Sequence, residues 1–162
     1  MRSVFLLVVI CMGLFSCDSD QVYHRYESLG GNWNINEPVT LEIKDIDSVQ
    51  PYNLYITVRN DNRYPYSNLF LITSLEFPQG HTLTDTLEYE MAAPDGRWLG
   101  EGFGDIKESK LVYKRGERFR ESGTYTFTVE HAVRKNGNIS GDQTLKGITE
   151  VGLRIEKQLE KN

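Results

Sequence analysis

The amino-acid sequence predicts an all-β fold, an antiparallel β-sandwich of jelly-roll or immunoglobulin-like type with about seven to nine strands. Short runs alternate between apolar and polar residues, which is the period of a strand with one face in the core. Turn residues interrupt these runs about every 8–15 residues, and no helical segments alternate with them. Nine Tyr, seven Phe and the lack of long Ala, Leu, Glu and Lys runs also favour strands.

The N-terminus has the parts of a bacterial secretion signal. Residues 1–3 are short and carry a positive charge, and residues 4–15 form an apolar run. This run lies within the roughly 7–15 residues of a signal-peptide core and is shorter than the ~20 residues that a membrane-spanning helix needs. We therefore expect residues 1–16 to be a signal peptide that is removed.

Cys17 ends a pattern that resembles the lipobox of bacterial lipoproteins. Residues 14–17 are Leu-Phe-Ser-Cys, in the order apolar, loosely specified, small, cysteine. The resemblance implies that Cys17 becomes the new N-terminus, with diacylglycerol on its sulfur and an acyl chain on its amine. The alternative is an ordinary secretory signal without lipid. Cys11 fits the pattern poorly because Ile10 is too large for the position before the cut.

Cleavage before Cys17 leaves 146 of the 162 residues, which suits a single domain that buries about 68–70% of its unfolded surface. Cys17 is then the one remaining cysteine, so we expect neither a disulfide nor a cysteine-based metal site. Two or more acyl chains attach a protein stably, and we expect the lipid to hold this protein on a membrane.

The charge balance argues against nucleic acid as a partner. The formal net charge of −5 becomes −6 when Arg2 leaves with the signal peptide. An acidic chain without a basic stripe is suited neither to phosphate backbones nor to anionic lipid headgroups.

Residues 17–37 predict a lipid-anchored tether in front of the folded domain. The part up to Ser28 is polar, with Tyr23 and Tyr26 as residues that dock it on the domain. The remainder is rich in turn residues, and we expect Trp33 to plug one end of the core.

Residues 38–157 predict the sandwich domain, and residues 158–162 a charged tail. Alternation predicts seven strands, at 39–43, 52–59, 69–77, 83–91, 110–114, 124–132 and 151–155. The third is apolar at nearly every position of its first half, which predicts a central strand covered on both faces. A shift of one residue would expose a whole apolar row, so the alternation also constrains the pairing.

Few side chains are arranged for catalysis, and we expect neither an enzyme nor a cofactor. The three histidines lack metal-ligand spacing, and His131 ends an apolar strand row, which predicts a place at the edge of the core. The glycines of residues 100–104 lack the strand-to-helix context of a phosphate loop and predict a bulge or bend. Four acidic residues could meet around Ca²⁺, but we favour a solvated acidic rim. These are Asp95, Glu101, Asp105 and Glu108.

Aromatic residues beside turns are the better functional lead. Tyr64, Tyr66 and Trp98 lie outside the strand alternation. If exposed, they would stack on a sugar or contact a partner protein. If buried, they would cap the core, and we favour this second interpretation.

Four long stretches, residues 51–80, 85–113, 122–137 and 147–157, resemble the gliding motility lipoprotein family GldH of Bacteroidota. The resemblance covers nearly all of the protein from Cys17 onward. It implies an outer-membrane lipoprotein required for gliding and for the associated type 9 secretion system. Both the periplasmic face and the surface face of that membrane remain open as its location. It implies contacts with other Gld lipoproteins and no catalytic residue.

The same phylum implies O-glycosylation at Asp-Ser/Thr-apolar patterns, here at Ser48 and Thr86. Two other functions remain as alternatives. One is a carbohydrate-binding module at the cell envelope that uses Tyr64, Tyr66 and Trp98. The other is a hydrolase, although no pair of acidic residues stands out for that role.

Overall fold

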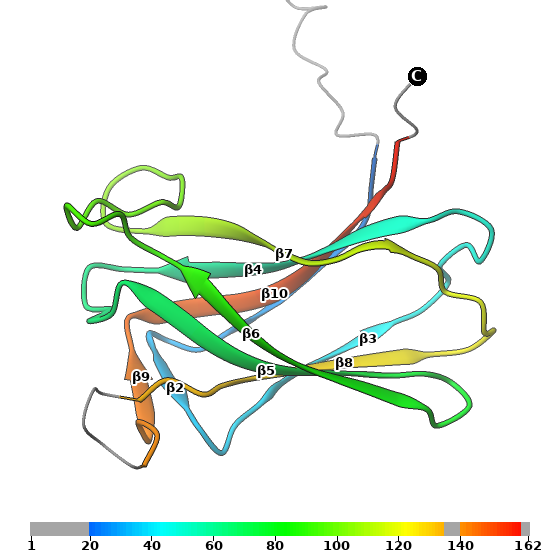
Figure 1. Cartoon of the computed structure of the whole chain (residues 1–162), viewed down its shortest axis with the longest axis horizontal. Coiled ribbons are helices and arrows are strands. Elements are labelled where there is room, and N and C mark those ends of the chain that lie inside the picture. The colour runs from blue at the N-terminus through cyan, green and yellow to red at the C-terminus, as the bar shows by residue number, and fades with distance from the viewer. Residues whose placement is uncertain (1–19, 135–139, 160–162) are drawn as a thin grey trace, which may run out of the picture.

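The structure, a computed structural model, describes residues 20–134 and 140–159. Within these residues there are ten strands and no helix (Figure 1). They are β1 (Gln21–Ser28), β2 (Asn32–Asn34), β3 (Val39–Ile43), β4 (Tyr52–Asn60), β5 (Asn68–Glu76), β6 (Thr82–Glu90), β7 (Lys107–Glu117), β8 (Tyr125–His131), β9 (Thr144–Lys146) and β10 (Ile148–Lys157). The prediction of an all-β fold is confirmed.

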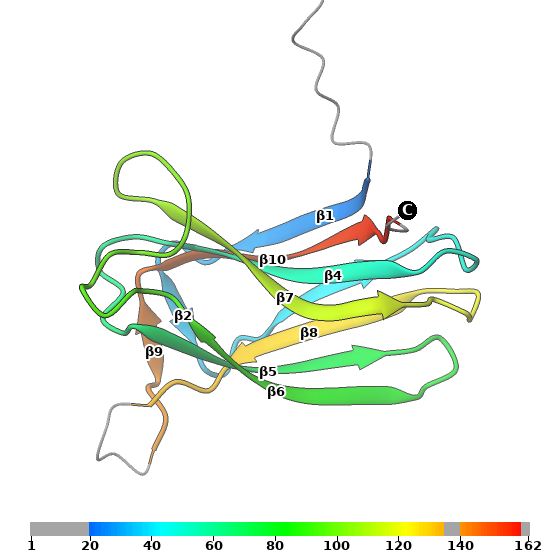
Figure 2. The same ribbon diagram turned by 45° about the horizontal axis from the view of Figure 1, so that its top comes forward.

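The strands form two main sheets that face each other, as expected of a sandwich. One sheet has the order β1-β10-β4-β7 and the other the order β3-β8-β5-β6, with antiparallel pairing throughout. The short pair β2–β9 lies at one end, between the two sheets (Figure 2). There it opposes Trp33 to Leu145, and both side chains are completely buried, so Trp33 plugs the core as predicted.

The core consists of the inward-facing residues of both sheets. In β8, for example, every second residue from Tyr125 to His131 is buried and those between are half-buried. The predicted alternation therefore sets which face of each strand is inside. The burial of each large apolar residue contributes roughly 1.5–3 kcal/mol, so these rows hold the two sheets together.

One strand is covered differently from the prediction. β5 lies inside its sheet, between β8 and β6, but only one of its faces is buried. Phe70 and Ile72, on its other face, are half-buried. The expectation of cover on both faces is wrong because no further layer of described residues packs against the outside of this sheet.

The predicted tether over residues 17–37 is too long, because Gln21–Ser28 is the edge strand β1, paired with β10 along its length. The sandwich therefore begins near residue 21 instead of residue 38. The Tyr23 hydroxyl donates to the backbone C=O of Glu42 at 3.0 Å and joins β1 to the edge of the opposite sheet. Residues 1–16, Cys17 and the last three residues of the predicted tail lie outside the described residues.

The two ends of the sandwich are defined by where the strands begin and end. Gln21 pairs with Glu156, and Tyr52 with both Lys157 and Glu117, so β1 begins where β10 and β7 end. We call this the N-terminal end, on the right of Figure 1, and the opposite end the distal end. β4 runs from one end to the other over nine residues, a span of roughly 30 Å at ~3.3 Å per residue.

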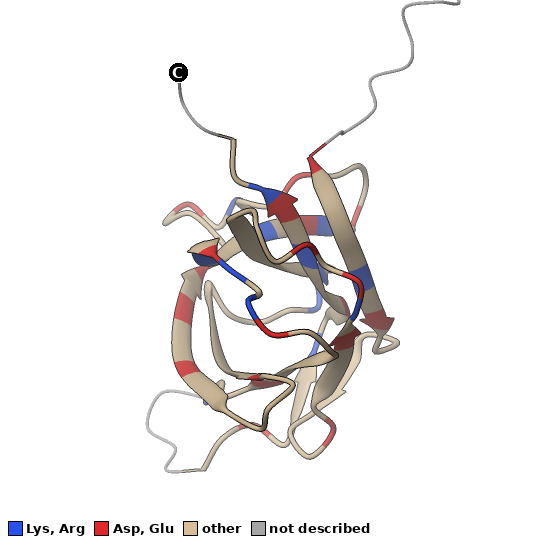
Figure 3. Cartoon of the chain, turned by 90° about the vertical axis from the view of Figure 1, so that its right-hand side faces the viewer, with Lys and Arg blue, Asp and Glu red and all other residues tan. Residues whose placement is uncertain are grey.

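Basic and acidic positions are interspersed when the molecule is viewed from the N-terminal end (Figure 3). Among the described residues, no helix meets the length and hydropathy that crossing a membrane requires.

Candidate interaction surface at the distal end

The connection between β6 and β7 forms a loop that is closed at its base by backbone hydrogen bonds. The Glu101 N–H donates to the Glu108 C=O at 2.8 Å, and the Glu108 N–H donates to the Glu101 C=O at 2.7 Å. The Lys107 ammonium also donates to the C=O of Gly102 at 2.7 Å. Three hydrogen bonds therefore join the two arms of the loop near its base.

This loop presents a fully exposed aromatic ring. Phe103 has a relative exposure of 102%, and Leu99 and Ile106 beside it are exposed by 45% and 41%. Gly102 has a φ of +149°, and a Cβ there would lie 2.5 Å from the C=O of Ile106. Only glycine avoids this clash. Gly102 therefore allows the tight turn that places Phe103 at the tip of the loop.

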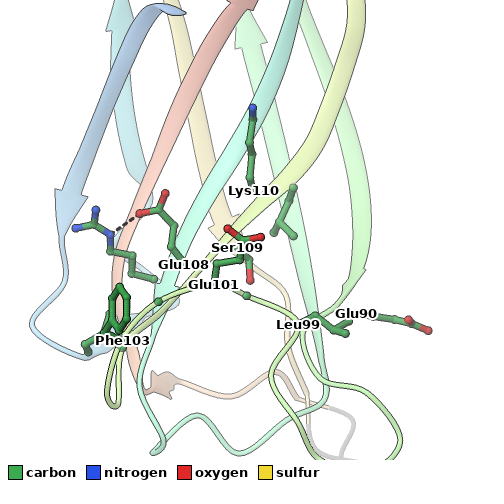
Figure 4. Close-up of a pocket in the computed structure, with 12 residues that line it drawn as sticks. Glu90, Leu99, Glu101, Phe103, Glu108, Ser109 and Lys110 are labelled. Atoms are coloured by element: carbon green, nitrogen blue, oxygen red, sulfur yellow. Dashed lines mark hydrogen bonds and ion pairs between the residues drawn. The ribbon is translucent and has the colours of Figure 1, made fainter. Parts of the chain in front are cut away.

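An open cavity of about 850 Å³ lies between this loop and the first half of β7 (Figure 4). Figure 4 shows Glu90 and Leu99 toward one end of it and Phe103 at the other. Its lining mixes apolar and charged side chains. They are Arg59, Glu90, Leu99, Glu101, Phe103, Ile106, Glu108, Ser109, Lys110 and Leu111, with Gly100 and Gly102.

The guanidinium of Arg59 is engaged by two carboxylates. Its Nε donates to Glu108 at 2.7 Å, and its Nη1 donates to Glu150 at 2.7 Å. The hydrogen bond to Glu108, followed by the charges of both carboxylates, raises the pKa of Arg59. The guanidinium carbon also lies 5.2 Å from the ring centroid of Tyr26. Arg59 thus ties together β4, β7, β10 and β1.

The second cation at the cavity is engaged as well. Lys110 donates from Nζ to Glu156 at 2.6 Å and lies 4.2 Å from the ring centroid of Tyr55. By contrast, the carboxylates of Glu90 and Glu101 make no ion pair or hydrogen bond with another described residue. The cavity therefore has two carboxylates, Glu90 at one end and Glu101 near its middle (Figure 4), that its own cations do not neutralise.

The structure brings the three predicted aromatic residues together beside this loop. The Tyr64 ring lies 5.9 Å from that of Tyr66 and 6.1 Å from that of Trp98. Tyr64 is only 3% exposed, and its hydroxyl donates to the C=O of Asn68 at 2.7 Å. Burial is the main reason that the pKa of Tyr64 is strongly raised. The burial of Tyr64 agrees with the favoured interpretation that these residues cap the core. Its ring is not accessible for stacking on a sugar.

The outer two rings are half-buried and joined to neighbouring loops. The Tyr66 hydroxyl donates to the Asp142 carboxylate, and this hydrogen bond raises the pKa of Tyr66 to about 12. The Trp98 indole donates to the amide oxygen of the Asn62 side group at 3.2 Å. The amide nitrogen of Asn62 in turn donates to Asp105 at 2.9 Å, which links the aromatic cluster to the loop of Phe103.

The other predicted residues lie elsewhere. Ser48 is exposed in the loop between β3 and β4 at the N-terminal end, and Thr86 is exposed in the edge strand β6. Cys17 lies outside the described residues. His131 is buried, with Nε2 at 3.1 Å from the C=O of Trp33, so its predicted place in the core is confirmed.

The acidic residues considered for Ca²⁺ do not form a site. Within residues 20–134 and 140–159, no group of three His, Cys, Asp or Glu residues could hold a metal ion. Glu108 instead pairs with Arg59, and Asp105 accepts a hydrogen bond from Asn62.

Phe103, Leu99 and Ile106 do not stand out as functional residues in the sequence. The available signal is a single aromatic residue between glycines, in a segment without strand alternation. The prediction of a bend at these glycines is correct, but what the bend presents depends on the loop's hydrogen bonds.

Known proteins match this protein along nearly its whole length. The family model described as GldH lipoprotein matches residues 21–155. A relative from Christiangramia forsetii, a gliding motility lipoprotein GldH homolog, is 52% identical over 155 residues, which are 96% of this chain and 95% of the relative. The gliding motility lipoprotein GldH of Flavobacterium johnsoniae is 46% identical over 153 residues, 94% and 95% of the two proteins.

Solved structures give a much weaker match. The VP2 subviral particle of infectious bursal disease virus aligns with a TM-score of 0.40 and 15% identity over 85% of this chain. The present protein spans only 33% of the length of that VP2 chain.

Proposed function

This chain belongs to the GldH lipoprotein family, and we propose that it is a lipid-anchored, non-enzymatic contact component of the outer-membrane machinery for gliding and type 9 secretion. The family match and both relatives support the role in gliding and the lipoprotein character. Cys17 carries the lipid, because it follows a signal-peptide core and is the one cysteine left after cleavage. The partners are other Gld lipoproteins.

The position of the anchor decides which end of the sandwich faces other proteins. Only residues 18–20 separate Cys17 from the start of β1. Four residue steps of at most ~3.6 Å keep the N-terminal end within about 14 Å of the lipid. This attachment lets the distal end, with Phe103, extend up to roughly 30 Å further from the membrane, where partner proteins can reach it.

The observation that carries this proposal is the fully exposed Phe103 ring at the tip of a loop whose base is closed by hydrogen bonds. Full burial of such a side chain is worth roughly 1.5–3 kcal/mol, and this domain gains none of it. Aromatic side chains often contribute most of the binding free energy of a protein interface. Their contribution is largest when the loop that carries them loses little conformational entropy on binding. Phe103 with Leu99 and Ile106 therefore forms the centre of the contact surface.

The test is complementation of a Flavobacterium johnsoniae strain that lacks its own GldH. We expect Phe103→Ser to abolish colony spreading and the co-purification of other Gld lipoproteins, while protein level and melting temperature stay unchanged. The matched control is Val49→Ser, which removes a side chain that is 72% exposed at the opposite end. Normal spreading and co-purification with Phe103→Ser would refute the contact role.

The anchor has a separate test. We expect Cys17→Ser to move the protein from the outer-membrane fraction of a density gradient to the soluble fraction. If the variant stays with the outer membrane, the lipid on Cys17 is not what holds it. Protease treatment of intact cells, with a periplasmic protein as control, determines which face of the outer membrane carries the domain.

Ser48 and Thr86 are exposed and therefore accessible to an O-glycosylating enzyme. Ser48 is the better acceptor, because it lies in a loop, whereas Thr86 lies within a paired strand opposite Ile72. Intact-mass measurement of the protein from its native host should show a glycan that Ser48→Ala removes. An unmodified mass would end this proposal.

A further inference from the structure

We propose that the cavity beside β7 binds an extended, basic segment of a partner protein, which adds as a short strand to the free edge of β7 at Lys110. This inference rests on the proposed contact function and specifies its binding mode. It depends on three features of the described residues: one open backbone position on a strand edge, an acidic lining and an apolar rim.

The first feature is the edge itself. β7 is bonded to β4 alone within its sheet, and backbone groups of an edge strand point alternately toward the neighbour and outward. Glu108 faces outward, since it bonds to Glu101. Val112 faces outward as well, because its C=O accepts a hydrogen bond from the Tyr89 hydroxyl at 2.7 Å.

Lys110 lies midway between these two residues, in a stretch where β7 pairs regularly with β4. Its backbone N–H and C=O therefore also point outward, toward the cavity. Neither group has a hydrogen-bond partner among the described residues. The bridge at Glu101 already shows that this edge accepts an antiparallel backbone, and the open position is the next one along the strand.

The lining determines the chemistry of the occupant. Arg59 and Lys110 are already paired with carboxylates of this protein, whereas Glu90 and Glu101 have no described cationic partner. A Lys or Arg in the bound segment would be matched by these two carboxylates. Leu99 and Phe103 lie toward the two ends of the cavity (Figure 4), and apolar residues of the segment can contact these exposed side chains on either side of the basic residue.

A second copy of this protein is a poorer occupant than a different protein. Pairing of two β7 edges would bring the unneutralised carboxylates of both copies together. Like charges at such short range are repulsive, and the negative formal net charge, −5 for the whole sequence, adds to the repulsion. A basic segment of another protein removes this conflict.

The experiment uses the mature lipidated protein in detergent and blocked heptapeptides of alternating Lys and Val. We expect the Lys/Val peptide to bind at least tenfold more tightly than a Glu/Val peptide in calorimetry. Methylation of alternate backbone nitrogens of the Lys/Val peptide should weaken its binding at least tenfold. This methylation removes the peptide N–H that would donate to the outward C=O of Lys110. Equal binding of the Lys/Val and Glu/Val peptides would overturn the proposal.

Two substitutions at one position isolate the backbone contribution. Lys110→Pro removes the outward N–H, and proline is tolerated at such edge positions. Lys110→Ala removes the same side chain and keeps the N–H. We expect tenfold weaker binding for Lys110→Pro and less than a twofold change for Lys110→Ala, with melting temperatures as the folding control. If the proline variant does not fold, Glu90→Gln with Glu101→Gln should lower the affinity and its salt dependence.

Failure of this inference can be distinguished from failure of the proposed function. Normal gliding with Lys110→Pro and lost gliding with Phe103→Ser would refute the strand addition and keep the contact role. Normal gliding with both variants would refute the contact role itself.

Discussion

Gly147→Ala should be among the most damaging small substitutions in this protein. Gly147 lies between β9 and β10 with a φ of +83°. A Cβ at this position would lie 2.2 Å from the backbone nitrogen of Tyr64 and 2.6 Å from its Cα. Hydrogen bonds from Asp61 N–H to the Gly147 C=O, at 2.8 Å, and from Gly147 N–H to the Gly31 C=O, at 2.9 Å, hold the two segments in place.

Two costs add up in this substitution. An L-residue at positive φ costs roughly 1–2 kcal/mol. The contact is with backbone atoms, which have no rotamer to give way, and overpacking of this kind costs typically about 1–3 kcal/mol. We therefore expect the free energy of unfolding to fall by about 2–5 kcal/mol, a large part of the roughly 5–15 kcal/mol of a typical domain.

The measurement is urea unfolding of the protein from residue 18 onward, with Gly80→Ala as the matched control. Gly80, in the turn between β5 and β6, has a φ of +88°, and a Cβ there would have no atom within 4 Å. Its substitution should carry the positive-φ cost alone, about 1–2 kcal/mol. Equal losses for the two variants would refute the steric part of this reasoning.

Three further predictions concern the core and the loops. Burial lowers the pKa of His131, so the unfolded protein takes up a proton first as the pH falls below about 6.5. The free energy of unfolding should therefore fall between pH 7 and pH 5.5, and His131→Gln should flatten this slope in urea titrations; an unchanged slope would contradict the assignment. Tyr66→Phe should cost about 1–3 kcal/mol, since it leaves the carboxylate of Asp142 without its donor, and a smaller loss would show that water replaces the hydroxyl. Leu153→Ala, in a fully buried position, should cost about 2–5 kcal/mol in the same assay. Val112→Ala, at a position 38% exposed, should stay within about 0.5 kcal/mol, and similar losses for these two variants would contradict the assigned core.

Much of the fold could be predicted from the sequence because strand alternation is a local property. The rows of β4 and β8 are apolar at every second residue, and this period alone identifies their inner faces. The burial of Trp33 follows likewise from one large apolar residue in a turn-rich segment.

β1 could not be predicted in the same way. An edge strand with a solvated face needs few apolar residues, so Gln21–Ser28 has the composition of a tether. What makes it a strand is its pairing with β10, which lies more than a hundred residues away in the sequence. Such pairing depends on which edges remain open once the other strands have assembled, and no local pattern records that.

The contact surface likewise has some properties that follow from the sequence and others that depend on the tertiary structure. The amino-acid sequence by itself determined the all-β class, the inner face of most strands and the signal that predicts lipid on Cys17, because each depends on neighbouring residues. Only the tertiary structure decided that Tyr64 is buried, that Phe103 is exposed and that the backbone of Lys110 faces an open cavity. These properties depend on contacts between β4, β6, β7 and their loops, which meet only after the protein has folded.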